Sequence, residues 1–185
     1  MSEATHERVA IFDRGDLELS FRADWTAKPD TTGRHMVFKD GKDSCSVEVS
    51  VLRIGPALRE VAPPIEAQLR AALAGMRVVG PDPEIRTSDR GDLWLAWCEW
   101  GYGADDSERG ERRKARQRTL VASNGLFQAL VTFCYWTDDA AWAVPAFERI
   151  VATMRLGDGS KLRSVRDHWS MRDPPMDGKR RRKPR

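Results

Sequence analysis

Apolar residues recur along this chain with two different periods. Near the N-terminus, Leu17, Leu19 and Phe21 alternate with polar residues, and the same alternation returns between residues 45 and 51. A period of two is that of a strand with one buried face. The pattern therefore predicts two short strands around a tight turn within residues 9–21, a strand at residues 35–39 and a strand at residues 45–51.

Two other segments carry apolar residues at the spacing of an α-helix. The first, residues 65–76, follows two consecutive prolines, which suit a helix start because the N–H groups of the first turn have no intrahelical partner. The second, residues 147–154, is followed by Gly157, a residue typical of helix ends. Pro145 is expected to kink this second helix or to divide it in two.

The second half of the chain contains the most apolar strand pattern. Residues 93–102 carry apolar side chains on both faces, which predicts a central strand that is covered on both sides. The dipeptide Asn124-Gly125 favours a type I′ hairpin turn, which requires positive φ at both positions. The glycine-rich, charged residues 101–114 predict a long exposed hairpin loop. Further strand patterns cover residues 84–88, 117–123 and 126–136.

The order of these elements defines the predicted fold class. It is an α+β fold, in which an antiparallel β-sheet of about six to eight strands is covered by two main helices. The length of 185 residues suits one such domain. We predict an N-terminal arm at residues 1–8, the folded domain at residues 9–157, and a basic, disordered tail at residues 158–185 that folding does not need.

Positive charge is concentrated at the C-terminal end of the chain. The formal net charge is +3, but residues 161–185 hold 10 Lys and Arg against 3 Asp and Glu, a net charge of +7. The preceding 160 residues carry a net charge of −4, so the predicted domain itself has little attraction for phosphate. The tail could bind nucleic acid weakly and with strong salt dependence, but a solubilising end explains the same composition.

Several segments together resemble a known family. A strand leads to a tryptophan in Leu17–Trp25, a tryptophan-rich strand and a hairpin follow the first helix, and the second helix closes on Ile150–Arg155. Over residues 9–156 this resembles the PsbP-like α/β/α sandwich, in particular its bacterial branch of DcrB-like proteins and Eag chaperones of type VI secretion effectors. The resemblance implies that sandwich fold and a binding, assembly or chaperone function.

No motif for catalysis, cofactor binding or metal ligation stands out. The Walker A, G-x-G-x-x-G, G-x-S-x-G and H-E-x-x-H patterns are missing from the sequence. Cys45, Cys98 and Cys134 each lie in an apolar strand pattern, which favours buried, reduced thiols over a disulfide or a metal site. We therefore predict a non-enzymatic, cytoplasmic protein that needs no cofactor or metal, has no catalytic residues and does not insert into a membrane.

Tryptophan is the most informative residue type, with 7 in the chain. Trp97 is interpreted as a core residue, whereas Trp100, Trp136 and Trp142 are predicted to anchor a protein partner on a sheet face or in a groove between sheet and helix. The resemblance implies the sharpest form of this hypothesis, a chaperone or adaptor that shields an apolar segment of a secreted effector. A nucleic-acid-associated protein that acts through the tail is the alternative, a hydrolase is the third hypothesis, and a homodimer stays open.

Overall fold

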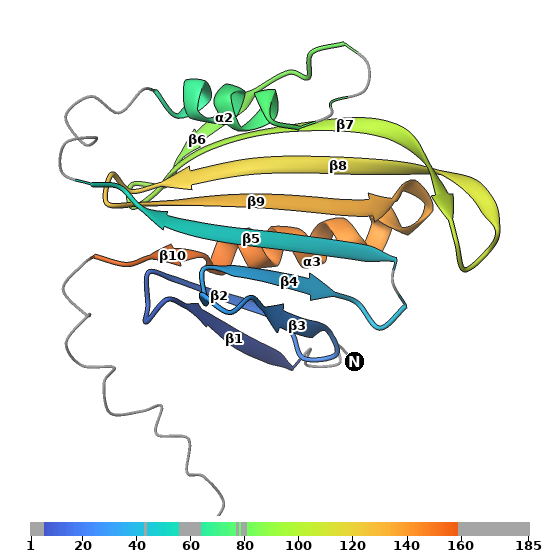
Figure 1. Ribbon diagram of the computed structural model, residues 1–185, viewed down its shortest axis with the longest axis horizontal. Coiled ribbons are helices and arrows are strands. Elements are labelled where there is room, and N and C mark those ends of the chain that lie inside the picture. The colour runs from blue at the N-terminus through green and yellow to red at the C-terminus, as the bar shows by residue number, and fades with distance from the viewer. Residues whose placement is uncertain (1–5, 43, 56–63, 77, 79–80, 159–185) are drawn as a thin grey trace, which may run out of the picture.

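The computed structural model describes residues 6–42, 44–55, 64–76, 78 and 81–158. Its main element, called the large sheet below, is a 7-stranded antiparallel sheet with the strand order β3-β4-β5-β9-β8-β7-β6 (Figure 1). The central strand is therefore β9. The strands of the large sheet are β3 (Thr26–Pro29), β4 (His35–Lys39), β5 (Cys45–Arg53), β6 (Arg86–Asp89), β7 (Trp94–Asp106), β8 (Glu111–Ser123) and β9 (Phe127–Trp136).

A second, 3-stranded antiparallel sheet, called the small sheet, lies beside the large one. Its strands are β1 (Glu7–Phe12), β2 (Leu17–Arg22) and β10 (Arg155–Leu156), in the order β1-β2-β10. The chain turns closely where β10 meets the β1–β2 turn. A Cβ atom at Gly157 would lie 2.6 Å from the carbonyl oxygen of Gly15, so only glycine fits this approach.

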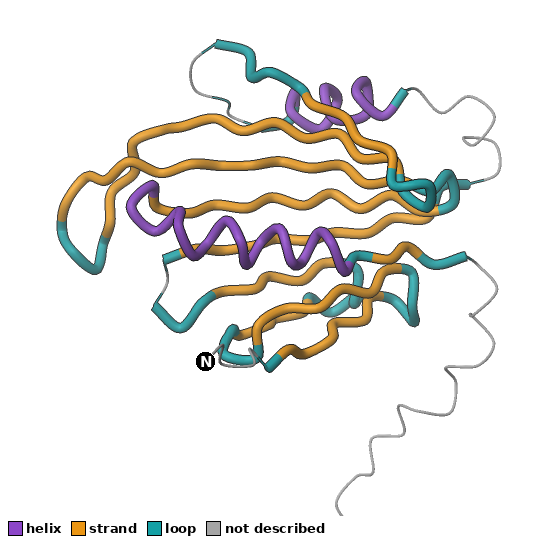
Figure 2. Tube along the Cα trace, turned by 180° about the vertical axis from the view of Figure 1, so that it is seen from behind, coloured by secondary structure: helices purple, strands orange, loops and turns teal. Residues whose placement is uncertain are grey.

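Two helices cover opposite faces of the large sheet. Helix α3 (Ala140–Thr153), which follows the short 3₁₀ helix η1 (Thr137–Asp139), packs against β9 and against β2 of the small sheet (Figure 2). Helix α2 (Ile65–Ala74) packs over β7 and β8 on the other face. This arrangement confirms the predicted α+β sandwich. Among the helices that the structure describes, none has the length and apolar character needed to cross a lipid bilayer.

Strand β7 has two apolar faces for a different reason from the one predicted. It is not central but second from the edge, between β8 and the short β6. Leu95 belongs to the main core on the α3 side, whereas Ala96 and Cys98 belong to a smaller cluster beneath α2. Both faces are apolar because a helix covers each of them, and helix coverage does not require a central position.

The predicted long loop at residues 101–114 is also wrong. Strands β7 and β8 stay paired as far as Asp106 and Glu111, so the turn between them is short (Figure 1). In this extension, Asp105 lies opposite Arg112 on the neighbouring strand. Opposite charges in cross-strand pairs stabilise an exposed hairpin, which explains how a charged, glycine-rich segment forms strands rather than a loop.

The Asn124-Gly125 hairpin is confirmed, but its turn differs from the predicted type. Only Gly125, with φ of +80°, has positive φ at this dipeptide. The side-chain Oδ1 of Asn124 instead accepts hydrogen bonds from the backbone N–H groups of Leu126 at 3.0 Å and Phe127 at 2.9 Å. The asparagine side chain thus closes the turn in place of a second left-handed residue.

The sequence Asp-Arg-Gly-Asp occurs twice, at residues 13–16 and at residues 89–92, and forms a hairpin turn in both places. The first copy joins β1 to β2, and the second joins β6 to β7. In the second copy, the Arg90 guanidinium donates hydrogen bonds to the backbone carbonyls of Val151 at 2.7 Å and Met154 at 3.2 Å. The Val151 carbonyl also accepts the backbone N–H of Met154 at 3.2 Å, so Arg90 adds a charged donor to carbonyl groups at the end of α3. A cation there also interacts favourably with the helix dipole.

Replacing Arg90 by alanine is expected to lower the free energy of unfolding by about 1–2 kcal/mol, because two carbonyl groups at the end of α3 lose a charged donor. Urea denaturation followed by circular dichroism measures this change. Arg14→Ala is the matched control, since Arg14 occupies the same position in the other copy of the motif and its side chain is exposed. Equal losses in the two variants would contradict the capping role.

Three local features of the chain depart from the sequence prediction. Helix α3 continues through Pro145 without a break, so the expected division is wrong. Pro145 lies in the first half of the helix, and its neighbours Ala143 and Phe147 are both buried in the core, where tertiary packing holds the segment helical. Strands β3 and β10 were not predicted. Both are short and mostly exposed, so neither has an alternating apolar pattern.

Candidate partner-binding site at the end of the large sheet

The three predicted anchors do not form one cluster. Trp100 is 8% exposed and packs with Leu69 in the apolar cluster beneath α2. Trp136, the last residue of β9, is partly exposed, and so is Trp142 near the start of α3. The structure thus brings Trp136 and Trp142 to one end of the large sheet, on either side of η1, and places Trp100 elsewhere.

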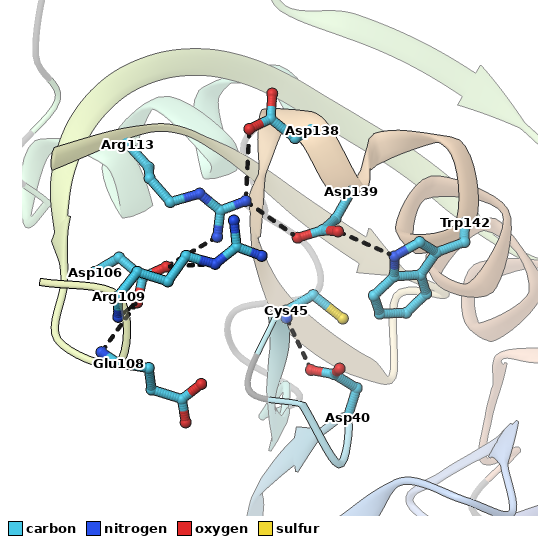
Figure 3. Close-up of polar contacts among 9 residues, drawn as sticks. All are labelled: Asp40, Cys45, Asp106, Glu108, Arg109, Arg113, Asp138, Asp139 and Trp142. Atoms are coloured by element: carbon cyan, nitrogen blue, oxygen red, sulfur yellow. Dashed lines mark hydrogen bonds and ion pairs between the residues drawn. The ribbon is translucent and has the colours of Figure 1, made fainter. Parts of the chain in front are cut away.

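An arginine from the neighbouring strand connects these two tryptophans. The guanidinium of Arg113, on β8, lies over the Trp136 ring at 4.8 Å from its centroid. One of its nitrogens lies 3.5 Å from a carboxylate oxygen of Asp139, and the other oxygen of Asp139 accepts a hydrogen bond of 3.4 Å from the indole N–H of Trp142 (Figure 3). A chain of polar contacts therefore runs from one tryptophan to the other around the end of β9.

The side chain of Arg113 is nearly buried, at 7% exposed, and several carboxylates surround it. It donates a hydrogen bond of 2.9 Å to Asp106, and Asp138 of η1 lies 3.5 Å from another of its nitrogens (Figure 3). The hydrogen bond from Arg113 lowers the pKa of Asp106, and the same bond raises the pKa of Arg113. Asp106 and Arg113 therefore stay charged across the whole neutral pH range.

Local backbone geometry fixes Asp106 in this position. Its carboxylate Oδ1 accepts hydrogen bonds of 3.1 Å from the backbone N–H groups of both Glu108 and Arg109 (Figure 3). These bonds close the turn between β7 and β8, so a single aspartate both ends the turn and orients Arg113 towards η1. The long hairpin is in this way tied to the start of α3.

A pocket of about 180 Å³ lies beside Trp136, on the face of the large sheet that α2 covers only in part. Its lining includes Tyr102 of β7, Ala115 of β8, Cys134 of β9 and Ser46 of β5. Tyr102 and Cys134 form a side-chain hydrogen bond, and burial raises the pKa of Tyr102 to about 12. The pocket therefore presents a neutral phenol and a predominantly apolar wall.

The cysteines near this site have the properties of structural residues. Burial raises the pKa of Cys98 to about 11, and it also raises the pKa values of Cys45 and Cys134. All three thiols stay protonated at neutral pH, so none supplies a thiolate nucleophile. Within the described ranges, no three His, Cys, Asp or Glu side chains are grouped so that they could hold a metal ion.

A second apolar groove, of about 260 Å³, runs between α3 and the strands β7 and β8. Trp97 and Phe147 form part of its wall, and the Arg118 guanidinium lies 5.2 Å from the Trp97 ring centroid and 5.6 Å from that of Phe147. Trp97, interpreted from the sequence as a core residue, is thus partly exposed. Because Arg118 stacks on both rings, this groove is already partly filled by the chain itself.

The neighbours of the tryptophans were not identified from the sequence. Arg113 was assigned to a solvated basic loop, and Asp106 and Tyr102 were given no role. Residues 105 and 106 are acidic and residues 112 and 113 are basic; read as facing strands rather than as a loop, this pattern places Asp106 near Arg113. Nothing in the sequence relates Arg113 to Asp139, because that contact depends on the register between β8 and β9.

Comparison with known proteins places the chain in a family. The sequence pattern of the family described as Alr1449 matches residues 8–159, which is most of the chain. This chain belongs to the Alr1449 family. The protein described as "Uncharacterized protein alr1449" of Nostoc sp. (strain PCC 7120) is 26% identical over 152 residues, which cover 81% of this chain and 77% of that protein.

Solved structures share the fold of this member of the Alr1449 family. CyanoP, the cyanobacterial PsbP of Synechocystis sp. PCC 6803, is similar with a TM-score of 0.57 and 10% identity, over 85% of this chain and 97% of CyanoP. A Bacteroides thetaiotaomicron VPI-5482 protein also gives 0.57, with 12% identity, over 82% of this chain but only 49% of its own length. A mutant form of Mog1 gives 0.50, with 7% identity, over 82% and 96%.

The likeness to CyanoP confirms the PsbP-like fold that the sequence predicted. At these identities the likeness extends to the fold alone, because function depends on sites that differ between proteins of one fold. The narrower resemblance, to DcrB-like proteins and Eag chaperones, stays a prediction. The fold is compatible with a non-enzymatic binding module.

Proposed function

We propose that this chain is a non-enzymatic protein-binding module, and that its partner binds at the end of the large sheet around Trp136 and Trp142. The observation that carries the proposal is the pair of partly exposed tryptophans held in fixed positions by Arg113 and Asp139, of which Trp136 also lines a predominantly apolar pocket. Tryptophan, tyrosine and arginine are the residue types that dominate binding energy at protein interfaces.

Rigidity of the site supports this function. Indole rings that are already oriented lose little conformational entropy on binding, so more of the contact energy appears as affinity. Trp136 is fixed by the Arg113 guanidinium above its ring, and Trp142 by its hydrogen bond to Asp139 and by packing against the core. Trp100, the third predicted anchor, exposes too little surface to contribute in the same way.

The finer form of the proposal is a chaperone or adaptor for a secreted effector. It rests on the resemblance noted from the sequence, and the predominantly apolar wall of the pocket suits an apolar side chain of an effector segment. In this form the bound partner is an apolar segment that would otherwise be exposed to water.

Capture from a lysate of the producing organism tests the proposed function. The full-length chain is immobilised as wild type, Trp136→Ala, Trp142→Ala and Trp94→Ala, and bound proteins are quantified at low and high salt. Trp94 is the matched control, because it is 52% exposed but lies at the other end of β7. We expect a partner that the wild type and Trp94→Ala retain equally and that Trp136→Ala binds at least about tenfold more weakly.

The same experiment separates the proposal from its alternative. Binding through the tryptophans and the apolar pocket should change little with salt, since salt screens contacts between charges and not apolar contacts with the partner. Binding that falls steeply with salt and is unaffected by the tryptophan substitutions would favour nucleic-acid association through the basic tail. That predicted tail, residues 158–185, lies outside the described residues except for Asp158. Trp100→Ala is not used, because replacing a buried residue would confuse lost binding with lost folding.

A further inference from the structure

In the described part of the chain, the outer edge of β1 is the most prominent unpaired feature. Strand β1 forms one margin of the small sheet, below the large sheet in Figure 1. It pairs with β2 on one side, and no strand of the described residues pairs with its other side. On this strand Val9 is 63% exposed and Ile11 is 46% exposed, two of the four large apolar side chains exposed in the described chain.

Hydrogen bonding to β2 determines which backbone groups of β1 face outward. The Ala23 amide donates to the His6 carbonyl at 3.0 Å, and this pair continues the register of β1 with β2. In an antiparallel pair, hydrogen-bonded residues alternate with non-bonded ones. Residues 8, 10 and 12 therefore bond to β2, and Glu7, Val9 and Ile11 direct their N–H and C=O groups to the open edge.

The other three edge strands are less suited to strand addition than β1: β10 has only 2 residues, and β3 and β6 carry features that oppose it. Edge strand β3 contains Lys28 and Pro29, a charged residue and a residue without an N–H donor. Edge strand β6 has four residues, all polar and all exposed. By contrast, β1 has six residues and no proline; its charged residues, Glu7 and Arg8, lie at its start, and two exposed apolar side chains follow them. An edge of this kind is suited to pairing with another strand.

We propose that β1 is a dimerisation edge, which pairs antiparallel with β1 of a second copy of this chain about a twofold axis at Val9. In this register Val9 faces the second copy's Val9, and Glu7 faces its Ile11, so all three outward residues form their backbone hydrogen bonds. On one face, Val9 and Ile11 of both copies then form a continuous apolar cluster of four side chains.

Charge and strand length select this register over its neighbours. Only shifts of two residues preserve the outward hydrogen-bonding pattern. A shift one way would place Arg8 opposite Arg8 of the second copy, and like charges directly opposite each other in a strand pair are destabilising. A shift the other way would place Glu7 opposite Asp13, which lies in the turn beyond the end of β1, so Glu7 would have no strand residue to pair with. The Val9-centred pairing has neither defect. Because one short strand buries little area, the dimer is expected to be weak and concentration-dependent.

Sedimentation equilibrium of the full-length chain, from about 1 to about 500 µM, tests this proposal. The wild type should shift from monomer to dimer over this range. Val9→Pro should raise the dissociation constant at least about tenfold, since proline removes an outward N–H that β2 does not use. Val9→Lys should have the same effect by adding a charge to the edge. Leu52→Lys is the matched control, because Leu52 is 50% exposed on β5, away from the β1 edge.

Circular dichroism establishes that each variant is folded. If Val9→Pro disturbs the fold, the comparison of wild type with Val9→Lys alone tests the dimer. A wild type that stays monomeric at the highest concentration would overturn the proposal. So would a dimer that survives both Val9 substitutions, or one that Leu52→Lys alone abolishes.

Discussion

Replacing Phe133 by alanine is expected to lower the free energy of unfolding by about 3–5 kcal/mol, the range for truncating a fully buried aromatic side chain. Phe133 is completely buried on the central strand β9. Its ring is stacked between Phe147 of α3, at 4.5 Å between centroids, and Tyr135, at 4.6 Å. The substitution therefore removes both a large apolar volume and the contact that joins α3 to the large sheet.

Urea denaturation, followed by both tryptophan fluorescence and circular dichroism, measures this loss. Leu52→Ala is the control, because Leu52 is half exposed and its truncation should change the unfolding free energy by no more than about 0.5 kcal/mol. If Phe133→Ala cost as little as the control, the stack between β9 and α3 would not be a main source of stability.

Replacing Glu99 by glutamine is expected to lower the free energy of unfolding by about 1–3 kcal/mol at neutral pH, because charged hydrogen bonds are lost. The Glu99 side chain, on β7, is mostly buried. Its carboxylate accepts hydrogen bonds from Arg116 at 2.6 Å, Arg118 at 3.0 Å and the Tyr135 hydroxyl at 3.1 Å. Glutamine keeps the shape of the side chain but removes the nearer charged partner of Arg118, leaving Glu148 at 3.9 Å.

The stability loss expected for Glu99→Gln depends on pH in a defined direction. Burial alone would raise the pKa of Glu99, but the hydrogen bond from Arg116 and the charge and hydrogen bond of Arg118 outweigh it and hold the pKa below its usual range. A carboxyl group with a lowered pKa in the folded state stabilises the fold above its unfolded pKa, and that contribution disappears as the pH falls through the folded pKa. The difference between wild type and Glu99→Gln should therefore be largest above about pH 5 and shrink towards about pH 3.

Asp16 provides an internal contrast, since burial raises its pKa in the folded protein. Asp16→Asn should therefore relieve a cost that is present only when the carboxyl is ionised, so it should raise the free energy of unfolding relative to wild type at neutral pH. This gain should shrink as the pH falls and Asp16 is protonated, so its pH profile should have the opposite sign to that of Glu99→Gln. Parallel pH profiles for the two variants would contradict the assignment of opposite environments to these two carboxyl groups.

Elements with a periodic apolar pattern were predictable from the sequence. The alternating valines of β5 and the helix-spaced apolar residues of α2 show from the sequence which face of each element is buried. The prolines before Ile65 mark where α2 begins. Strand β3 was missed because three of its four residues are exposed. The tip of the β7–β8 hairpin was missed because charge and glycine resemble a loop until Asp105 and Arg112 are recognised as partners on facing strands.

The site was predicted only in part, for a physical reason. Tryptophan residues at strand ends could be identified as candidates from position alone, and two of them, Trp136 and Trp142, lie at one end of the sheet. Whether a tryptophan is covered depends on helix placement, and α2 buries Trp100 because it packs over β7 and β8. The role of Arg113 depends on contacts between a strand and η1 that no local pattern contains.

Site-specific photo-crosslinking tests the central claim, a protein partner bound beside Trp136, most directly. Benzoylphenylalanine is introduced at Ser46, which lines the pocket beside Trp136, and separately at Trp94, which is exposed at the far end of β7. Both variants are irradiated in cells of the producing organism and adducts are identified by mass spectrometry. The account predicts a defined protein adduct from position 46 that is lost when Trp136→Ala is added, and no such adduct from position 94. The same adduct from both positions, or one that persists with Trp136→Ala, would contradict it.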